Sequence, residues 1–560
     1  MVRNFIGFLL FCILVFTTSA YPFTGSSFRL ASTGRLLEDD FDLLFDPARI
    51  PEIKGERLYT SLSNFVDQNE EVFSNTDNGF FLIGGSTDSE KNRYGGLVFD
   101  RLIDETPQFT GLFDRNGNPL FGMGEREDVT FFDDDGNNIY DRKSLFQETR
   151  EARTEETAKD FFLGLARYFG DTRFGIGWEH NEGRTDTIRS GDNFTFRNEE
   201  TNLITGDLLL TDDEIGTGFV RDKFNSNTLL LSYWFFAGQD LDVGLRVGVT
   251  PFSSQDMEWW DEVQMTNRSP TDPSIDSYNR FESFTDSVPT KGLGIRGGGT
   301  GFYDWNETVQ TRVFLNIFTS SFDIKEGARL ETIFQDADTL TLGGDYVVSS
   351  NNNSTTGPIT GDGSSQSLDL FTYTWAKLTD DVTFAIGIRG TGTTRDETRI
   401  TDQSTVEVFS YNDGDGVPEF ADSTVTVTSS QVVEEKTSSS VNQLSVPVGI
   451  EFKIKKPVFL RLGAIHTETF TDRTTNDVQT EYSESLRHAE YGDGTFSDDL
   501  VDPSFQIPGT SETTESRSSE TVYTYGLGIF VSKNLQIDLM GFSDLTDLSN
   551  WKLSAILKFD

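Results

Sequence analysis

Short segments in which apolar and polar residues alternate recur throughout this chain of 560 residues. In the C-terminal segment 551–559, one face of a strand would carry Trp551, Leu553, Ala555, Leu557 and Phe559. Ile556 is the one apolar residue on the opposite face. A period of two over about ten residues suits a tilted strand that crosses a bilayer. Since any half-buried strand also alternates, the recurrence of the pattern is what constrains the fold.

The N-terminus predicts export. Residues 1–20 combine Arg3, an apolar run from Phe5 to Phe16 and a small-residue cleavage site at 18–20, which together are typical of a signal peptide. A membrane anchor is the alternative, but the apolar run is short for a span. Cys12 is the only cysteine, so the mature chain would have no thiol for disulfides, zinc or catalysis. An exported chain without disulfides favours a Gram-negative bacterial envelope.

The composition narrows the class of protein further. The formal net charge is −45, which makes nucleic acid an unfavourable partner. The chain contains 49 Phe and 51 Gly, as expected for strands with aromatic girdles and small residues facing a lumen. Since no stretch approaches 18 consecutive apolar residues, helical spans are excluded.

The alternating segments come in pairs. Within a pair the connection is a short turn: 170–171, 238–240, 304–306, 379–381, 455–457 and 533–534. Between pairs lie long polar stretches, predicted as loops, at 103–157, 185–223, 252–289, 322–366, 395–436 and 472–517. Alternation of short and long connections is the topology of an outer-membrane barrel with periplasmic turns and long acidic extracellular loops.

The segments predict an all-β protein, an antiparallel up-and-down transmembrane barrel of about sixteen strands, with fourteen as the alternative count. The candidate strands are 57–65, 79–87, 92–102, 158–168, 172–182, 224–236, 240–250, 290–303, 307–320, 367–378, 382–394, 437–454, 458–470, 519–532, 535–543 and 551–559. The predicted organisation is a signal peptide (1–20), a periplasmic N-terminal segment (21–56) and the barrel with its loops (57–560).

Residues 38–50 carry a family resemblance. Asp39-Asp40, Phe45 and Pro47-Ala48 resemble the N-terminal signature of the long-chain fatty-acid transporter family of outer-membrane barrels, although Asp46 stands where that family usually has Asn. The resemblance implies that residues 21–56 enter the lumen as a plug in a barrel that passes hydrophobic molecules. The alternative is a short amphipathic turn that leads into the barrel. The last strand is similar to the signal read by the barrel-assembly machinery, except that Asp560 follows Phe559.

The same alternation predicts which charged residues face the lumen. The candidates for solute selection, as in a general porin, are Arg246, Arg296, Arg312, Arg389, Arg461, Asp242, Glu179, Glu451 and Asp538. Opposed charges on a lumen wall can select solutes by charge. The alternative is that the arginines pair with carboxylates and only fill and stiffen the lumen.

Three acidic turns around glycines are candidate calcium sites. Asp413, Asp415 and Glu419 form the strongest of three such clusters, because alternate carboxylates around a Gly turn can surround Ca²⁺. Ordinary acidic turns are the alternative, and they explain all three clusters. No other cofactor is expected.

These features predict a non-enzymatic outer-membrane channel for passive transport of small polar solutes. The three histidines, His180, His466 and His488, have no accompanying catalytic motif. The alternatives are uptake of hydrophobic compounds through a plugged barrel, and a surface protein with adhesive or assembly loops. The expected partners are outer-membrane lipid, the barrel-assembly machinery and small solutes, and association into a homo-oligomer is left open.

Overall fold

The computed structural model describes residues 27–63, 80–88, 93–113, 117–134, 136, 139–268, 277–340, 346–412, 422–455, 457–483, 485–502, 509–542 and 552–559. Three short helices come first: α2 (Phe28–Ser32), η1 (Asp42–Phe45) and η2 (Pro47–Glu52). No helix among the described residues is long and apolar enough for a membrane span.

The remaining elements are strands. They are β1 (Glu56–Ser63), β2 (Phe80–Asp88), β3 (Arg93–Pro107), β4 (Phe109–Phe113), β5 (Pro119–Phe132), β6 (Arg142–Phe169), β7 (Thr172–Ile188), β8 (Phe194–Asn202), β9 (Leu208–Phe236), β10 (Leu241–Arg268), β11 (Ser277–Asn306), β12 (Val309–Leu340), β13 (Tyr346–Thr379), β14 (Val382–Asn412), β15 (Ser423–Lys455), β16 (Val458–Tyr482), β17 (Ser485–Tyr491), β18 (Phe496–Asp502), β19 (Thr510–Ser532), β20 (Leu535–Phe542) and β21 (Lys552–Phe559).

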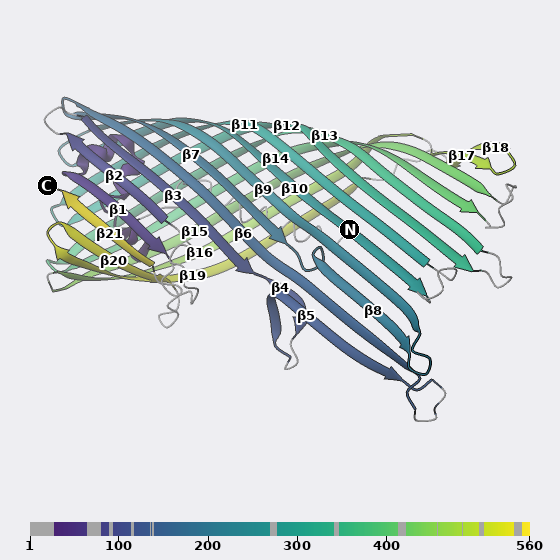
Figure 1. The fold of residues 1–560 in the computed structure, drawn as a ribbon. Coiled ribbons are helices and arrows are strands. Elements are labelled where there is room, and N and C mark those ends of the chain that lie inside the picture. The colour runs from purple at the N-terminus through teal and green to yellow at the C-terminus, as the bar shows by residue number, and fades with distance from the viewer. Residues whose placement is uncertain are drawn as a thin grey trace.

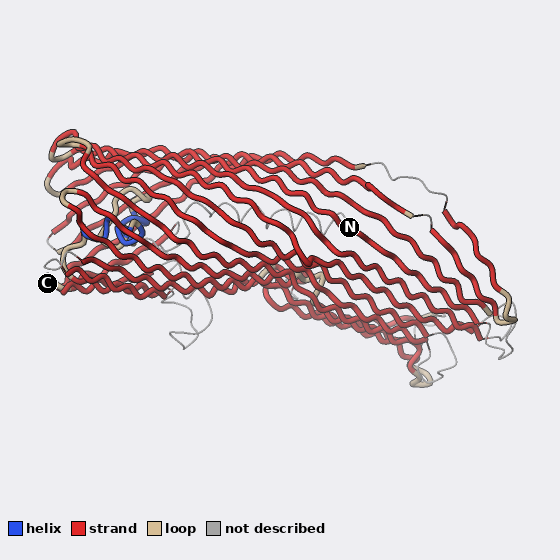
Figure 2. Tube along the Cα trace, turned by 90° about the horizontal axis from the view of Figure 1, so that it is seen from above, coloured by secondary structure: helices blue, strands red, loops and turns tan. Residues whose placement is uncertain are grey.

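Sixteen of the described strands form a closed antiparallel barrel (Figures 1 and 2). The ring runs β1, β2, β3, β6, β7, β9 to β16, β19, β20 and β21, and β21 returns to β1 with Leu557 opposite Leu58. Closure leaves no sheet edge among these strands. A β-structure in lipid must be closed in this way, because unpaired backbone groups cannot bind water there. The predicted fold class and the count of about sixteen strands are confirmed.

The short turns gather at one rim of the barrel. Each of the six predicted turns separates two strands of the ring, as where β6 ends at Phe169 and β7 begins at Thr172. The start of β1 and the end of β21 lie at the same rim, the left side of Figure 1. In an outer-membrane barrel this rim is periplasmic.

An apolar belt surrounds the barrel near this rim. Leu229, Leu231, Leu245, Val247 and Leu315 are among the large apolar side chains exposed on the outside. On β9, Thr228, Leu230 and Ser232 alternate with them and are buried toward the interior. A wall in contact with lipid needs paired backbone groups and apolar side chains outside, and the closed barrel with its apolar-out alternation provides both.

The long polar stretches differ from the prediction, because most of their residues are strand and not loop. Residues 322–366 lie largely in β12 and β13, and residues 395–436 in β14 and β15. β13 is 34 residues long, whereas a transmembrane strand needs only about ten. The barrel therefore continues beyond the belt as a sheet with many polar residues on both faces and a small buried apolar cluster of Val288, Ile324 and Ile359. The polar composition of these stretches is compatible with contact with water, but composition does not distinguish a hydrated strand from a loop.

Candidate functional site

Residues 27–53, called the inner segment below, lie inside the barrel near the short-turn rim (Figure 2). Ser27 caps α2, with its side chain accepting a hydrogen bond from the Leu30 amide. Gly34 has a φ of 64° and turns the chain out of α2. Asp46 caps η2 through the Ala48 amide, and Pro47 occupies the first turn, where its missing N–H costs nothing.

The inner segment contacts the wall on every side. α2 packs against β16, β19 and β20, whereas η2 packs against β3, β6, β7 and β9. Further contacts to β1, β11, β12 and β15 come from aromatic and charged side chains. A segment that touches strands all around the ring lies across the lumen at this level.

Glycines in the wall allow the backbone of the inner segment to approach closely. A Cβ atom at Gly175 would lie 2.4 Å from the Ala48 nitrogen, and one at Gly449 would lie 2.2 Å from the Thr33 oxygen. A Cβ atom at Gly463 would lie 2.4 Å from the Gly34 nitrogen. Since real Cβ atoms do not approach backbone so closely, only glycine permits this fit.

Two apolar clusters hold the inner segment against the wall. The first contains Phe41, Leu44 and Ile50 of the segment together with wall residues such as Phe162 and Ile556. The second combines the segment's Leu36, Leu37 and Ala48 with Trp234, Phe302, Phe314, Tyr373 and Ala385 of the wall. Ile556, the exception to the alternation of the last strand, is thus an inward residue that packs on the segment.

Glu38 is the central charged residue of the inner segment. It forms an ion pair of 3.0 Å with Arg49 of the segment and one with Arg312 of β12. Burial opposes ionisation, but the two guanidinium groups outweigh it and lower the Glu38 pKa to about 2. Arg49 and Arg312 both stack on Phe302, with their guanidinium carbons 4.8 and 4.3 Å from the ring centroid.

A second ionic network lies farther along the ring of strands, on β15, β16 and β20. Arg29 of α2 pairs with Glu451 of β15 at 2.9 Å. Arg461 of β16 pairs with the same carboxylate at 2.9 Å and with Asp538 of β20 at 2.7 Å. The network therefore joins the inner segment to three strands.

A third set of polar contacts surrounds η2. Asp46 accepts hydrogen bonds from the Ser232 hydroxyl and, at 2.7 Å, from the Trp234 indole. Arg173 of β7 pairs with Glu52 and lies 3.9 Å from Asp242. These contacts replace the water that the buried polar groups would otherwise bind.

The nine predicted lumen residues fall into two groups. Arg312, Arg461, Glu451, Asp538 and Asp242 belong to the ion pairs around the inner segment. The other four pair within the wall: Arg296 with Glu179, Arg246 with Asn316 at 3.2 Å, and Arg389 with Asp369 at 2.9 Å. Whether any of them selects solutes stays a prediction.

Sequence reasoning missed the aromatic part of the site. Phe162, Trp234, Phe302 and Phe314 face inward, where the alternation predicts small or polar residues. Their signal in the sequence is an apolar residue out of phase with the alternation, as at Ile556. Asp369 and Arg173 were also missed, although both lie at inward positions of predicted strands.

The remaining candidates lie elsewhere. Asp413, Asp415 and Glu419 fall outside the described residues, so the calcium site stays a prediction. The described part of the chain holds no group of three or more side chains suited to a metal ion. The histidines are separate: His180 contacts Asn227, His466 contacts Thr521, and His488 contacts Asp498.

Comparison with known proteins gives matches among solved structures only. No family model and no curated protein matches the chain. A mutant of the TodX monoaromatic hydrocarbon channel is 10% identical with a TM-score of 0.36, over 95% of this chain and 99% of that one. The Ralstonia pickettii toluene transporter TbuX is 11% identical with a TM-score of 0.31, over 96% and 99%.

A mutant of the ferric enterobactin receptor PfeA from Pseudomonas aeruginosa is 9% identical with a TM-score of 0.28, over 90% of this chain and 80% of that one. The closed barrel, its apolar belt and its short-turn rim make the chain a transmembrane β-barrel of the outer-membrane type.

Proposed function

We propose that the protein is an outer-membrane channel closed at its periplasmic rim by the inner segment, which acts as a plug. The observation that carries the proposal is the position of residues 27–53 across the lumen, in contact with strands all around the ring. Passage of a solute would require the segment to leave its observed, seated position or to rearrange within the barrel.

We further propose that the solutes are small and polar. Beyond the inner segment, the inward side chains include the pairs Arg296–Glu179 and Arg389–Asp369. The carboxylates of these pairs are buried, but the Arg296 and Arg389 side chains remain 22% and 21% exposed, and exposed charged groups retain much of their hydration. A hydrated wall favours polar solutes over hydrophobic ones.

Uptake of hydrophobic compounds is the second candidate, and the two apolar clusters favour it. If the inner segment moved, Phe162, Trp234 and Phe314 would line the passage at the periplasmic rim. A hydrophobic solute could replace the apolar side chains of the segment there.

Uptake by proteoliposomes distinguishes the two candidates. The wild type and the Arg312→Gln variant, which loosens the segment, are compared for entry of a radiolabelled small sugar and of a fatty acid. Faster sugar entry through the variant supports the polar channel, and faster fatty-acid entry alone supports the second candidate. If neither solute enters through either protein, the channel proposal is wrong.

A further inference from the structure

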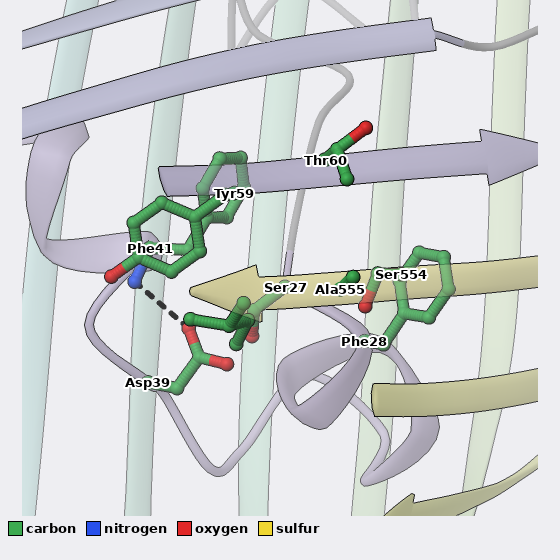
Figure 3. Close-up of a pocket in the computed structure, with 9 residues that line it drawn as sticks. Ser27, Phe28, Asp39, Phe41, Tyr59, Thr60, Ser554 and Ala555 are labelled. Carbon is green, nitrogen blue, oxygen red and sulfur yellow. Dashed lines mark hydrogen bonds between the residues drawn. The ribbon is translucent and has the colours of Figure 1, made fainter. Parts of the chain in front are cut away.

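A small cavity lies between the inner segment and the two strands that close the barrel (Figure 3). Asp39 and Phe41 line it from the segment, whereas Tyr59 of β1 and Ser554 of β21 line it from the wall. The Asp39 carboxylate accepts a hydrogen bond of 2.9 Å from the Phe41 amide. The cavity is about the size of a water molecule or a small ion.

Tyr59 brings a polar group with no partner to this cavity. Its side chain is only 2% exposed, and its hydroxyl oxygen forms no hydrogen bond with any residue that the structure describes. Buried hydroxyls nearly always have a partner. The orphaned hydroxyl therefore indicates that a small polar ligand belongs beside it.

The charges around the cavity do not balance. Arg57 pairs with Asp40, Arg29 with Glu451, and Arg461 with both Glu451 and Asp538. The nearby Glu38 is already paired with Arg49 and Arg312. Asp39 and Asp42 remain, and neither has an ion pair with a basic residue among the described residues. The surroundings are thus short of positive charge.

Asp42 also holds the inner segment together. Its carboxylate accepts hydrogen bonds from the Ser27 amide at 2.9 Å, the Ser27 hydroxyl at 2.6 Å and the Asp39 amide at 2.8 Å. These bonds join the start of α2 to η1. The charge state of the Asp39–Asp42 pair therefore affects how the segment is folded.

Both carboxyl groups bind a proton at a higher pH than a free aspartate does. Burial raises the pKa of Asp42 to about 6, although the hydrogen bonds from Ser27 oppose the shift. Burial also raises the pKa of Asp39 well above its usual range, and the neighbouring Asp42 and Asp538 carboxylates add to the effect. Arg29 opposes this shift without cancelling it.

We propose that the cavity binds one small hard cation, a proton or an alkali-metal ion, at Asp39 and Tyr59, and that the bound cation stabilises the seated inner segment. Carboxylate and hydroxyl oxygens are the ligands that such cations prefer. A role of this site in opening the channel in response to cations rests on the proposed function. Cation binding itself is independent of that function.

Hydrogen–deuterium exchange of the full-length protein in detergent tests the site without requiring transport. Exchange of peptides that cover residues 27–53 is measured at about pH 8 in Na⁺ or in N-methyl-D-glucamine at equal ionic strength, and again at about pH 5, with correction for the intrinsic rates. For one linked proton the seating equilibrium changes by up to about tenfold per pH unit. We expect the acidic sample and the Na⁺ sample to exchange more slowly.

Three variants make the result specific. Asp39→Asn removes the charge but keeps the acceptor for the Phe41 amide, so its segment should exchange more slowly and without the Na⁺ effect. A reduced pH effect should remain, because Asp42 still titrates near pH 6. Tyr59→Phe should lose the Na⁺ effect and keep the pH effect. Asp171→Asn, in the exposed turn between β6 and β7, is the control and should behave as the wild type.

The outcomes separate the sources of the cation. Dependence on Na⁺ and on pH supports an alkali-metal ion that competes with protons, and dependence on pH alone supports the proton. If the wild type shows neither dependence, or if Asp39→Asn keeps the wild-type response undiminished, the proposal is overturned. Exchange that responds to cations in a protein that passes no solute would support the site and refute the proposed function.

Discussion

Arg312 of β12 forms an ion pair with Glu38, a residue that lies 274 positions earlier in the chain and belongs to the inner segment. Each side chain is only 16% exposed. Removal of Arg312 leaves the buried Glu38 carboxylate with Arg49 as its remaining guanidinium partner, so the cost should be about half of the roughly 3 kcal/mol of a fully broken buried pair. The pair is therefore a suitable place to test how the segment is held.

Replacement of Arg312 by Gln should weaken seating of the segment by roughly tenfold, since each 1.4 kcal/mol corresponds to tenfold and Arg49 still pairs with Glu38. The measurement is the open probability of single channels in a planar bilayer. The exchanged pair Glu38→Arg with Arg312→Glu should recover part of the loss, although Arg49 would then repel the new arginine. An Arg312→Gln protein that opens no more often than the wild type would show that the ion pair does not hold the segment.

Gly175 offers a steric test. In Gly175→Ala, the added methyl group would overlap the backbone at Pro47 and Ala48, so we expect the segment to shift and its exchange of hydrogen to accelerate. Gly297→Ala is the matched control, because a Cβ atom there meets nothing within 4 Å. Equal exchange in both variants would contradict the close fit of the segment against β7.

Seating should depend on pH in opposite directions on the two sides of about pH 4. Glu38, with its pKa lowered to about 2, contributes stability above its usual value of 4.5 and loses it as the pH falls toward 2. Asp42, with its pKa raised to about 6, stabilises the seated segment fully below its usual pKa of 3.8. This stabilisation is lost as the pH rises through 6. Open probability from about pH 3 to 8 should therefore pass through a minimum. A monotonic curve would show that only one of the two groups is coupled to the segment.

The pair Arg389–Asp369 allows a test of selectivity away from the inner segment. Arg389→Gln leaves the Asp369 carboxylate, 4% exposed and on the lumen wall, without its guanidinium partner. We expect the reversal potential to shift toward cation preference, because low-dielectric walls focus the potential of an unpaired charge. The double variant Arg389→Gln with Asp369→Asn should return it toward the wild-type value. An unchanged reversal potential in the single variant would mean that the pair only stiffens the wall.

The barrel itself could be predicted from the sequence because its rule is local. Lipid requires apolar residues outside, so alternation such as that of Leu245, Val247 and Val249 marks each strand. The extension beyond the belt could not be predicted this way, because water lies on both faces and residues 346–366 show no apolar period. Its strands depend on ladder bonds to neighbours, as where Ser354 lies opposite Val406.

The position of the inner segment depends on contacts between residues far apart in the sequence. The resemblance at residues 38–50 implied a segment in the lumen, but nothing local to Glu38 identifies Arg312 as its partner. Ile556 and Trp234 carry a signal that sequence reasoning could have used. Each is an apolar residue out of phase with the alternation, so it faces inward, and its burial requires a segment in the lumen to cover it.

The conductance of a variant that lacks residues 27–53 tests the central claim most directly. The wild type and this variant, each shown by its heat-modifiable migration on a gel to be folded, are inserted into planar bilayers under the same conditions. The account predicts steady, ohmic steps from the variant and only rare openings from the wild type. Frequent wild-type steps of the same size as those of the variant would show that the inner segment does not close the lumen.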